Sequence, residues 1–254
     1  MKRRRLFVAL ASVVVALATT AEGQFGRRES GLPAAPNVPY DGRFTFVRIR
    51  YGRGTGGIRG PFNNSWNHDY PRADMHLSKI LKTITFIDAR TDATNILTLD
   101  DPDLFKYPIA YMSEPGYWAM TDREAQCFRE YLLKGGFAIF DDFEYEPEWN
   151  NFEAQMRRVF PEGKFVPLDV SHTVYDSFFR MTRIDFPHPM YGIKPDYRGL
   201  YERNDPTKRL MVIANHNADI AEYWEWSDTG LLPVDLSNEA YKLGVNYIIY
   251  GMTH

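Results

Sequence analysis

The chain has 254 residues, a formal net charge of −3, 15% aromatic residues and a single cysteine, Cys127. This length suffices for a substantial hydrophobic core, and a net acidic chain gives no electrostatic reason to expect nucleic acid as a partner. One cysteine excludes an internal disulfide. The composition therefore predicts a domain that is stabilised by its core and that has no nucleic-acid partner.

The first 23 residues have the order of a secretory signal peptide. The basic residues 2–5 precede an uncharged, mostly apolar run over 6–18, and small residues follow this run. The run is shorter than the roughly 20 apolar residues that a transmembrane helix needs. We therefore expect an exported protein, periplasmic or secreted, with no further transmembrane span; an uncleaved membrane anchor is the alternative. Removal of residues 1–23 would leave a net charge of −6.

Residues 24–42 separate this signal from the rest of the chain. They are rich in Gly, Pro, Arg and Ala, with evenly spaced prolines, a composition typical of an extended tether. No internal repeat and no later linker-like stretch is visible in the sequence. The sequence therefore predicts a single α/β domain over residues 43–254.

Strands and helices alternate in the pattern of this domain. Short runs of β-branched, aromatic or other apolar residues predict strands at 44–51, 84–87, 107–112, 137–140, 164–167 and 210–214. Apolar residues at helical spacing predict helices that begin near Asp69, Asp122 and Glu148, and a last helix over 239–252. The region 171–209 shows no regular pattern and is expected to lie over one edge. Because apolar strands without a polar face are typical of a sheet covered on both sides, we expect a flavodoxin-like open parallel sheet with helices on both faces.

Two helix starts have recognisable signals. Asp69 is the expected N-cap of the first helix, with Pro71 in its first turn. Thr121-Asp-Arg-Glu124 is a capping box, in which the side chains of the threonine and the glutamate bind each other's backbone N–H groups. The stripe of this second helix that is expected to face the sheet consists of Ala125, Phe128 and Leu132.

Polar side chains follow most of the predicted strands. In open parallel sheets, ligands bind beyond the carboxyl ends of the strands, so the residues at this rim form the candidate site. The candidate catalytic residues are Asp141, Asp142, Glu114 and His216. The candidate ligand-binding residues are His68, Asp69, Arg72, Arg53, Asn215 and Trp149.

Asp141 and Asp142 are the most informative pair at the rim. Two adjacent acids at the end of a buried strand repel each other, and one of them should have a raised pKa unless a cation or a basic partner lies near. One interpretation is a general base or a metal ligand. The alternative is an acid that caps a turn by accepting hydrogen bonds from backbone N–H groups.

A glycine-rich loop, Gly52-Arg-Gly-Thr-Gly-Gly57, follows the first predicted strand. It contains the spacing G-x-G-x-x-G, but a dinucleotide-binding fingerprint also needs a helix that opens at the third glycine, and the residues that follow are not helical in pattern. A nicotinamide cofactor is therefore not expected. The loop is either an anion-binding loop that uses Arg53 and Arg59 or a surface loop.

The sequence shows no established cofactor motif. The histidines lack zinc-binding spacings such as H-E-x-x-H, and no G-x-S-x-G elbow supplies a nucleophile for a catalytic triad. His68 lies beside Asp69 just before a predicted helix and is expected to reach the rim. No cofactor is evident, and a divalent metal bound by the rim acids stays open.

Five stretches are distinctive in combination. They are Trp66-Asn-His-Asp-Tyr-Pro-Arg-Ala-Asp74, Glu114-Pro-Gly116, Leu132-Leu-Lys-Gly-Gly-Phe-Ala-Ile-Phe-Asp-Asp142, Met156-Arg-Arg-Val-Phe-Pro161 and Leu243-Gly-Val-Asn-Tyr-Ile-Ile-Tyr-Gly-Met-Thr-His254. Over residues 43–254 the chain resembles the bacterial domain-of-unknown-function 4159 family. That resemblance implies a fold similar to class I glutamine amidotransferase-like domains, whose nucleophile is a cysteine after a central strand. If 137–140 is that strand, this chain has Asp141-Asp142 there, so the resemblance does not imply amidotransferase activity.

Two functions are compatible with these observations. The first is a non-catalytic ligand-binding or assembly module of the cell envelope, with an envelope protein or a carbohydrate as partner. Trp149 and the segment Tyr223-Trp-Glu-Trp226 would supply stacking faces for such a partner. The second is a hydrolase-like enzyme that uses Asp141 or Asp142 with His68, Glu114 or His216. The missing cysteine nucleophile favours the first.

Overall fold

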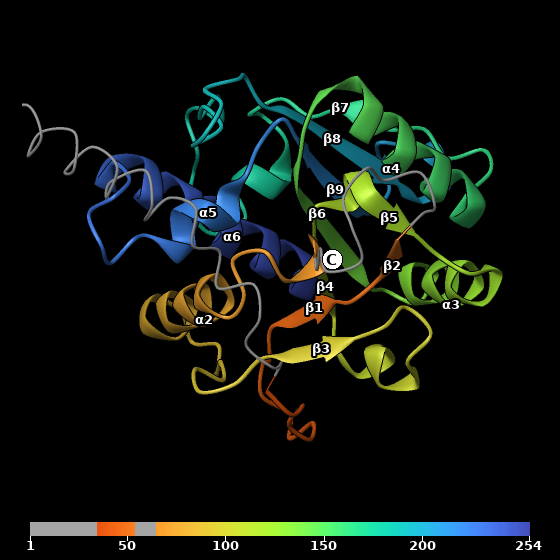
Figure 1. The fold of residues 1–254 in the computed structure, drawn as a ribbon, viewed down its shortest axis with the longest axis horizontal. Helices are drawn as coiled ribbons and strands as arrows, with labels where there is room; N and C mark the ends of the chain where they lie inside the picture. Colours follow the sequence, from red (N-terminus) through yellow and green to blue (C-terminus); the bar gives the residue numbers. More distant parts are fainter. Residues whose placement is uncertain (1–34, 54–64) are drawn as a thin grey trace, which may run out of the picture. The chain divides into compact units, whose positions relative to one another are not determined.

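An open sheet forms the centre of the fold (Figure 1). The computed structural model describes residues 35–53 and 65–254, and over these residues seven strands lie in the order β3-β1-β4-β6-β9-β8-β7. These strands are β1 (Val47–Ile49), β3 (Asn95–Leu97), β4 (Ile109–Ser113), β6 (Phe137–Phe143), β7 (Val166–Pro167), β8 (Asp196–Tyr201) and β9 (Leu210–His216). The predicted signal peptide, residues 24–34 of the predicted tether and most of the glycine loop lie outside the described residues.

Five neighbouring strands, β3-β1-β4-β6-β9, are parallel. Numbered along the chain, they have the order 2-1-3-4-5 of flavodoxin-like folds, which confirms the predicted α/β class. β8 pairs antiparallel with both β9 and β7, so the prediction of an irregular region over 171–209 is wrong for this segment. The segment is hard to recognise as a strand because Arg198 and Gly199 interrupt its buried tyrosines and leucine.

Helices cover both faces of the sheet, as predicted. The helices α2 (Arg72–Ile84), α5 (Ile220–Glu225) and α6 (Val234–Thr253) pack with one set of strand side chains into one core cluster. The helices α3 (Asp122–Leu133) and α4 (Tyr145–Val159) pack with the other set into a second cluster. Successive strand residues point to opposite faces, so Ile109 and Tyr111 belong to the first cluster and Ala110 and Met112 to the second.

α3 begins and packs as its sequence predicts. Thr121 Oγ1 accepts a hydrogen bond from the Glu124 N–H at 3.1 Å, and Glu124 Oε2 accepts one from the Thr121 N–H at 2.7 Å, which confirms the capping box. Ala125, Phe128 and Leu132 are all buried. The helix ends before Gly135, whose positive φ of 111° suits glycine.

Two local predictions are wrong. Residues 84–87 are not a strand, because α2 continues to Ile84 and the Phe86 ring that follows is fully exposed. The edge strand is instead β3, only three residues long, so its apolar pattern is too short to stand out. Asp69 is not the N-cap of α2, because its side chain makes no capping hydrogen bond and Pro71 directly precedes the helix.

The segment before β1 lies along the edge of the sheet. Asn37 donates a side-chain hydrogen bond to the Ile96 carbonyl at 2.8 Å, and the Val38 N–H donates one to Asn95 Oδ1 at 2.8 Å. The predicted tether is therefore fixed to β3 from Asn37 on. Contacts of this kind cover polar groups that an edge strand would otherwise expose.

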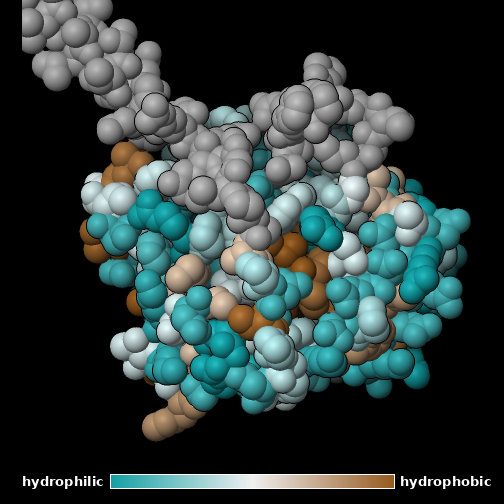
Figure 2. All heavy atoms as spheres, turned by 60° about the horizontal axis from the view of Figure 1, so that its bottom comes forward, coloured by the Kyte–Doolittle hydropathy of each residue, from teal (hydrophilic) through white to brown (hydrophobic). Residues whose placement is uncertain are grey.

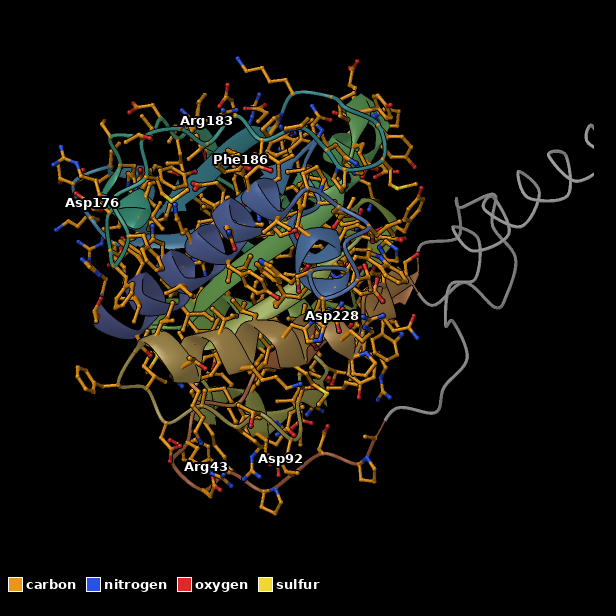
Figure 3. All side chains as sticks on the ribbon, turned by 90° about the vertical axis from the view of Figure 1, so that its left-hand side faces the viewer. Arg43, Asp92, Asp176, Arg183, Phe186 and Asp228 are labelled. Atoms are coloured by element: carbon orange, nitrogen blue, oxygen red, sulfur yellow. The ribbon has the colours of Figure 1, made fainter. Side chains whose placement is uncertain are left out.

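The surface in Figure 2 is mostly hydrophilic, with hydrophobic residues in small separate areas. Figure 3 shows the α2–α5–α6 face, with Asp228 just beyond α5. Among the residues that the structure describes, no helix has the length and apolar character needed to cross a membrane.

Candidate functional site

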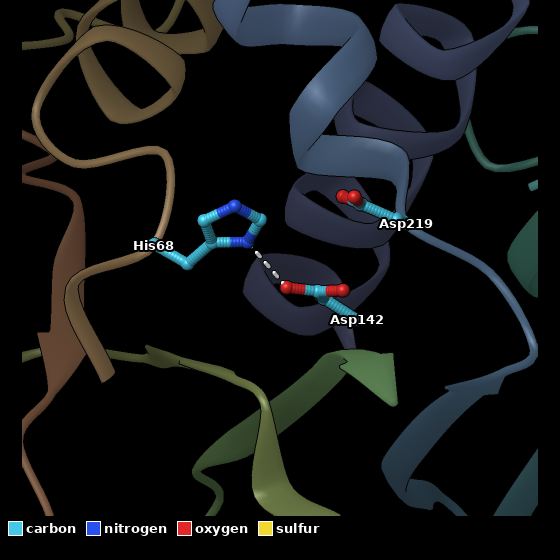
Figure 4. Close-up of side chains that lie close together, drawn as sticks. All are labelled: His68, Asp142 and Asp219. Atoms are coloured by element: carbon cyan, nitrogen blue, oxygen red, sulfur yellow. Dashed lines mark hydrogen bonds and ion pairs between the residues drawn. The ribbon is translucent and has the colours of Figure 1, made fainter. Parts of the chain in front are cut away.

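Three side chains converge at the carboxyl end of the sheet (Figure 4). His68 lies in the turn before α2, Asp142 is the penultimate residue of β6, and Asp219 lies at the N-terminus of α5. One ligand atom from each lies within 4.8 Å of those of the other two. The residues are far apart in the sequence, and the sheet brings together the segments that carry them.

Carboxylates surround the imidazole of His68. Its Nδ1 lies 2.5 Å from Asp142 Oδ2, 3.6 Å from Asp69 Oδ1 and 3.7 Å from Glu114 Oε1. The first distance is a short hydrogen bond, and the other two are ion-pair distances. Three carboxylates around one ring nitrogen create a centre that attracts cations.

Arg48 of β1 holds the turn that carries His68. Its Nη1 donates hydrogen bonds to the carbonyl oxygens of His68 at 2.7 Å and of Trp66 at 3.2 Å. The same guanidinium makes two bonds to the Asp74 carboxylate of α2, at 2.5 and 3.1 Å, and both side chains are completely buried. One buried ion pair thus connects β1, α2 and the His68 turn.

The N-terminus of α5 provides the opposite wall. Asp219 Oδ1 caps this helix by accepting a hydrogen bond from the Glu222 N–H at 2.9 Å. The N–H of Asp142 donates to the Ala218 carbonyl at 3.0 Å, which ties the end of β6 to the residue before the cap. Glu222, on the first turn of α5, forms a second group with His68 and Asp69 in which the ligand atoms lie within 4.8 Å of one another.

Asp142, Glu144 and His188 form a third group with the same spacing. His188 Nδ1 accepts a hydrogen bond from the Met190 N–H at 3.1 Å, so the proton of the neutral ring is on Nε2. That Nε2 donates to Glu144 Oε1 at 2.8 Å. Both ring nitrogens are therefore engaged, and burial lowers the pKa of His188. In this arrangement His188 is a hydrogen-bond donor that orients Glu144.

The backbone around the site is left-handed at several residues that are not glycine. Asp69, Glu114, Asp142, Tyr145 and Asn217 have φ values between 48° and 62°. Such a conformation is uncommon outside glycine and clusters at functional sites, where surrounding contacts hold it in place. Here the Tyr145 N–H donates to Asn217 Oδ1 at 2.9 Å, and the Asn217 N–H donates to the Phe143 carbonyl at 2.9 Å.

Burial and charge strongly perturb the pKa values of the groups around His68. Burial raises the pKa of Asp69 to about 7, of Glu222 to about 8 and of Glu144 to about 9, and neighbouring carboxylates add to the effect. Burial alone would lower the pKa of His68, but the charges of Asp69 and Asp142 raise it to about 11. Burial alone would raise the pKa of Asp142, but the charge and hydrogen bond of His68 lower it.

These groups can hold a metal ion. A mixed set of imidazole nitrogen and carboxylate oxygens, as in His68, Asp142 and Asp219, suits zinc, manganese or iron. Because ligands must lose their protons to bind a metal, a cation would take the place of the protons that the raised pKa values retain.

The two adjacent aspartates, Asp141 and Asp142, have different surroundings in the structure. Asp141 is completely buried, and its oxygens accept hydrogen bonds from Asn215 Nδ2 at 3.0 Å, the Tyr111 hydroxyl at 3.0 Å and the N–H groups of Ile220 and Ala221 at 3.1 Å. It therefore fixes the start of α5, as the turn-capping interpretation holds. Asp142 alone faces His68. Asn215, also completely buried, belongs with Asp141 and accepts a hydrogen bond from Tyr247.

His216, the last residue of β9, and Trp149 of α4 lie beside each other. The His216 Nε2 lies 3.1 Å from the Tyr145 carbonyl, and its Nδ1 lies 3.8 Å from Asp196. The His216 and Trp149 rings are 5.2 Å apart, and the Arg198 guanidinium lies 4.7 Å above the Trp149 ring. The structure therefore places the two residues in an aromatic cluster and not among the ligands around His68.

The two arginine candidates have other surroundings. Arg72 is the first residue of α2, pairs with Asp228 at 2.6 Å and lies over the Trp226 ring at 5.0 Å. The backbone of Arg53 belongs to the strand β2 (Gly52–Arg53), which pairs antiparallel with β5 (Trp118–Ala119); its side chain lies outside the described part, as does Arg59.

Several residues of the site are absent from the sequence-based candidates. They are Arg48, Glu144, His188 and Glu222, whereas Asp219 is one of the polar residues that follow the predicted strand at 210–214. The spacing Asp219-Ile-Ala-Glu222 after an apolar strand is a helix-start signal that points to the α5 pair. No signal in the sequence identifies His188, because its segment has no regular pattern.

The fold and the site together define an α/β domain with a flavodoxin-like sheet and a buried acidic cluster around one histidine. The chain matches, over residues 45–252, the family described as Domain of unknown function (DUF4159), and it belongs to this family. A comparison with curated proteins finds no match.

Proposed function

We propose that the domain binds a divalent metal ion through His68, Asp142 and Asp219, and that this ion takes part in binding a ligand. The proposal is carried by the carboxylates that surround His68. The His68 Nδ1 lies 2.5 to 3.7 Å from carboxylate oxygens of Asp142, Asp69 and Glu114. Buried carboxylates in such number are stable only with protons or a cation. A metal ion meets this need with the ligand types that imidazole and carboxylate offer.

We propose further that this binding serves the cell envelope. The basic, apolar and small-residue order of residues 1–23 supports export. An envelope protein or a carbohydrate would find partly exposed aromatic surface at Trp149, with Arg198 above its ring. The likeness to class I glutamine amidotransferase domains is also a proposal, supported by the 2-1-3-4-5 strand order.

A hydrolase is the second candidate, and the His68–Asp142 pair favours it. A carboxylate that binds Nδ1 orients an imidazole so that Nε2 can act as a general base. His68 Nε2 makes no hydrogen bond within the described part of the chain, whereas Nδ1 lies 2.5 Å from Asp142. In this role the histidine would exchange a proton through Nε2 with no cation on Nδ1, and because its pKa is raised to about 11 it would begin protonated at neutral pH and donate this proton as a general acid.

A cation titration tests the first candidate. Chelator-treated protein should gain thermal stability when Mn²⁺, Zn²⁺, Mg²⁺ or Ca²⁺ is added, by about 5–10 °C at a concentration 100-fold above Kd. The affinity should fall as the pH is lowered, because the cation must displace the proton of His68, whose pKa the charges of Asp69 and Asp142 raise to about 11.

Absence of any cation effect between pH 6 and 9, in melting or in equilibrium dialysis, would contradict metal binding. Hydrolysis of a chromogenic ester at the same rate before and after chelation would support proton transfer by His68 instead. Loss of hydrolysis on chelation would combine the two candidates in one metal-dependent enzyme.

Export has its own test. We expect the N-terminus of the protein isolated from the cell envelope to lie near Glu22 or Gln24, because the small residues before these positions are typical of a cleavage site. N-terminal sequencing of the fractionated protein measures this. An intact Met1 on protein from the cytoplasmic fraction would contradict export.

A further inference from the structure

A row of aromatic side chains begins beside the buried acids of the site. The Tyr191 ring lies 4.6 Å from the ring of His188, which donates a hydrogen bond to Glu144. The Tyr145 ring lies 6.3 Å from the Tyr191 ring, and the two residues are 55% and 59% exposed. Trp149, which is partly exposed, follows one turn further along α4. Tyr191, Tyr145 and Trp149 form what we call the aromatic row.

Tyr145 is held in a costly backbone conformation with its ring exposed. Its φ of 58° is uncommon for a residue with a large side chain. Its N–H donates to Asn217 Oδ1 at 2.9 Å, and its carbonyl oxygen accepts a hydrogen bond from His216 Nε2 at 3.1 Å. Conformations of this kind cluster at functional sites, where surrounding contacts hold them. Because the Tyr145 ring belongs to neither core cluster, its fixed position points to contact with a molecule outside the chain.

Tyr191 is held by a closed loop. The Gly192 N–H donates to the His188 carbonyl at 2.8 Å, which closes the loop around Tyr191. The Tyr223 hydroxyl donates to the Pro187 carbonyl at 2.9 Å and ties the same loop to α5. An aromatic ring that is already ordered loses little conformational entropy when a ligand binds. Both tyrosines of the row are therefore suited to hold a ligand.

Different polar groups lie at the two ends of the aromatic row. At one end are the carboxylate oxygens of Asp142 and Glu144, which accept hydrogen bonds and repel anions. At the other end the Arg198 guanidinium lies 4.7 Å above the Trp149 ring, the position that a cationic ligand would take. Its bond to Asp196 at 2.7 Å uses one of five N–H donors. A ligand that spans the row is therefore neutral and carries groups that both donate and accept hydrogen bonds.

We propose that the aromatic row binds a neutral carbohydrate chain, with one sugar ring against Tyr145 and Tyr191 and the next toward Trp149. This inference rests on the envelope-ligand part of the proposed function and extends the carbohydrate contact from Trp149 to the acids of the site. The C–H groups on one face of a sugar ring pack against an aromatic ring. Hydroxyl groups both donate and accept, so those of the sugar can donate to carboxylates and accept from Arg198.

Neutral oligosaccharides are the probes for the aromatic row. The pentamers of β-glucose, α-glucose, mannose and N-acetylglucosamine are titrated by calorimetry into chelator-treated protein, with and without Mn²⁺. Tyr191→Ala removes an exposed ring, so this variant should melt like the wild type and bind the sugar about 10-fold more weakly. Tyr145→Asn should have the same effect, because asparagine tolerates the positive φ but lacks the ring.

Phe86→Ala is the matched control, because this ring is fully exposed after α2 and lies outside the row; the variant should bind like the wild type. Binding of none of the four sugars, or equal affinity of wild type and Tyr191→Ala, would overturn the proposal. Tighter binding of decalysine or polygalacturonate than of the neutral chains would also overturn it.

The same titrations separate this inference from the metal site. Stabilisation by Mn²⁺ without sugar binding would overturn the aromatic row and leave the metal-binding proposal intact. Sugar binding that Tyr191→Ala weakens, with no effect of Mn²⁺ on stability, would support the row and contradict metal binding alone.

Discussion

Asp142→Asn should abolish the thermal stabilisation by divalent cations. The substitution keeps the size and polarity of the side chain but removes the carboxylate that lies 2.5 Å from His68 Nδ1. Loss of a residue that merely orients a metal ligand weakens affinity by about 10–100-fold, so loss of a ligand should weaken it by at least about 100-fold. Titration calorimetry with Mn²⁺ and melting with and without the cation measure the effect.

The neighbouring residue provides a matched control. Asp141→Asn makes the same chemical change one position earlier, where the carboxylate accepts four hydrogen bonds in the core. It should lower the free energy of unfolding by about 1–3 kcal/mol, because at least one buried donor then loses its acceptor, and it should leave the cation affinity near that of the wild type. Equal loss of affinity in the two variants would contradict the separate roles of Asp141 and Asp142.

Arg48→Met should have the largest effect on stability. Asp74 would remain as a buried carboxylate without its partner, and the carbonyl oxygens of Trp66 and His68 would lose their donor. Removing one member of a buried ion pair costs about 3–5 kcal/mol. Urea unfolding measures this loss, and cation affinity should also fall because the turn that carries His68 is no longer fixed.

The double variant Arg48→Met/Asp74→Leu tests the origin of this loss. Since it leaves no unpaired buried charge, it should be more stable than Arg48→Met alone. Its cation affinity should stay low, because the bonds from Arg48 to the His68 turn are still missing. A double variant no more stable than the single one would show that the loss comes from packing rather than from the Asp74 charge.

The sequence predicts the parts of the fold whose signals are local. The capping box of α3 and the long apolar run of β6 specify these elements within a few residues, and both are confirmed. The strand predicted at 84–87 is wrong because a β-branched and aromatic run there ends a helix and stays exposed at Phe86. β3 and β8 depend on pairing with distant strands, which no short pattern records.

The candidate site, too, is predicted from the sequence only where its signals are local. Asp142, Glu114, His68 and Asp69 meet because they follow or adjoin elements that the sheet brings together. The different roles of Asp141 and Asp142 depend on which of the two side chains points toward α5. The contact of His188 with Glu144 comes from an irregular segment. Both facts are tertiary contacts and have no sequence signature.

The left-handed backbone of Asp69, Glu114 and Asp142 has a consequence for substitutions at these positions. Glycine is the residue that adopts this conformation without strain. Substitution by glycine at one of these positions would therefore relieve the strain of the backbone but would also remove a carboxylate. Backbone stability and the carboxylates of the site therefore make opposite demands at these three positions. The fold holds these residues in the strained conformation, so their carboxylates are already oriented before any ligand binds.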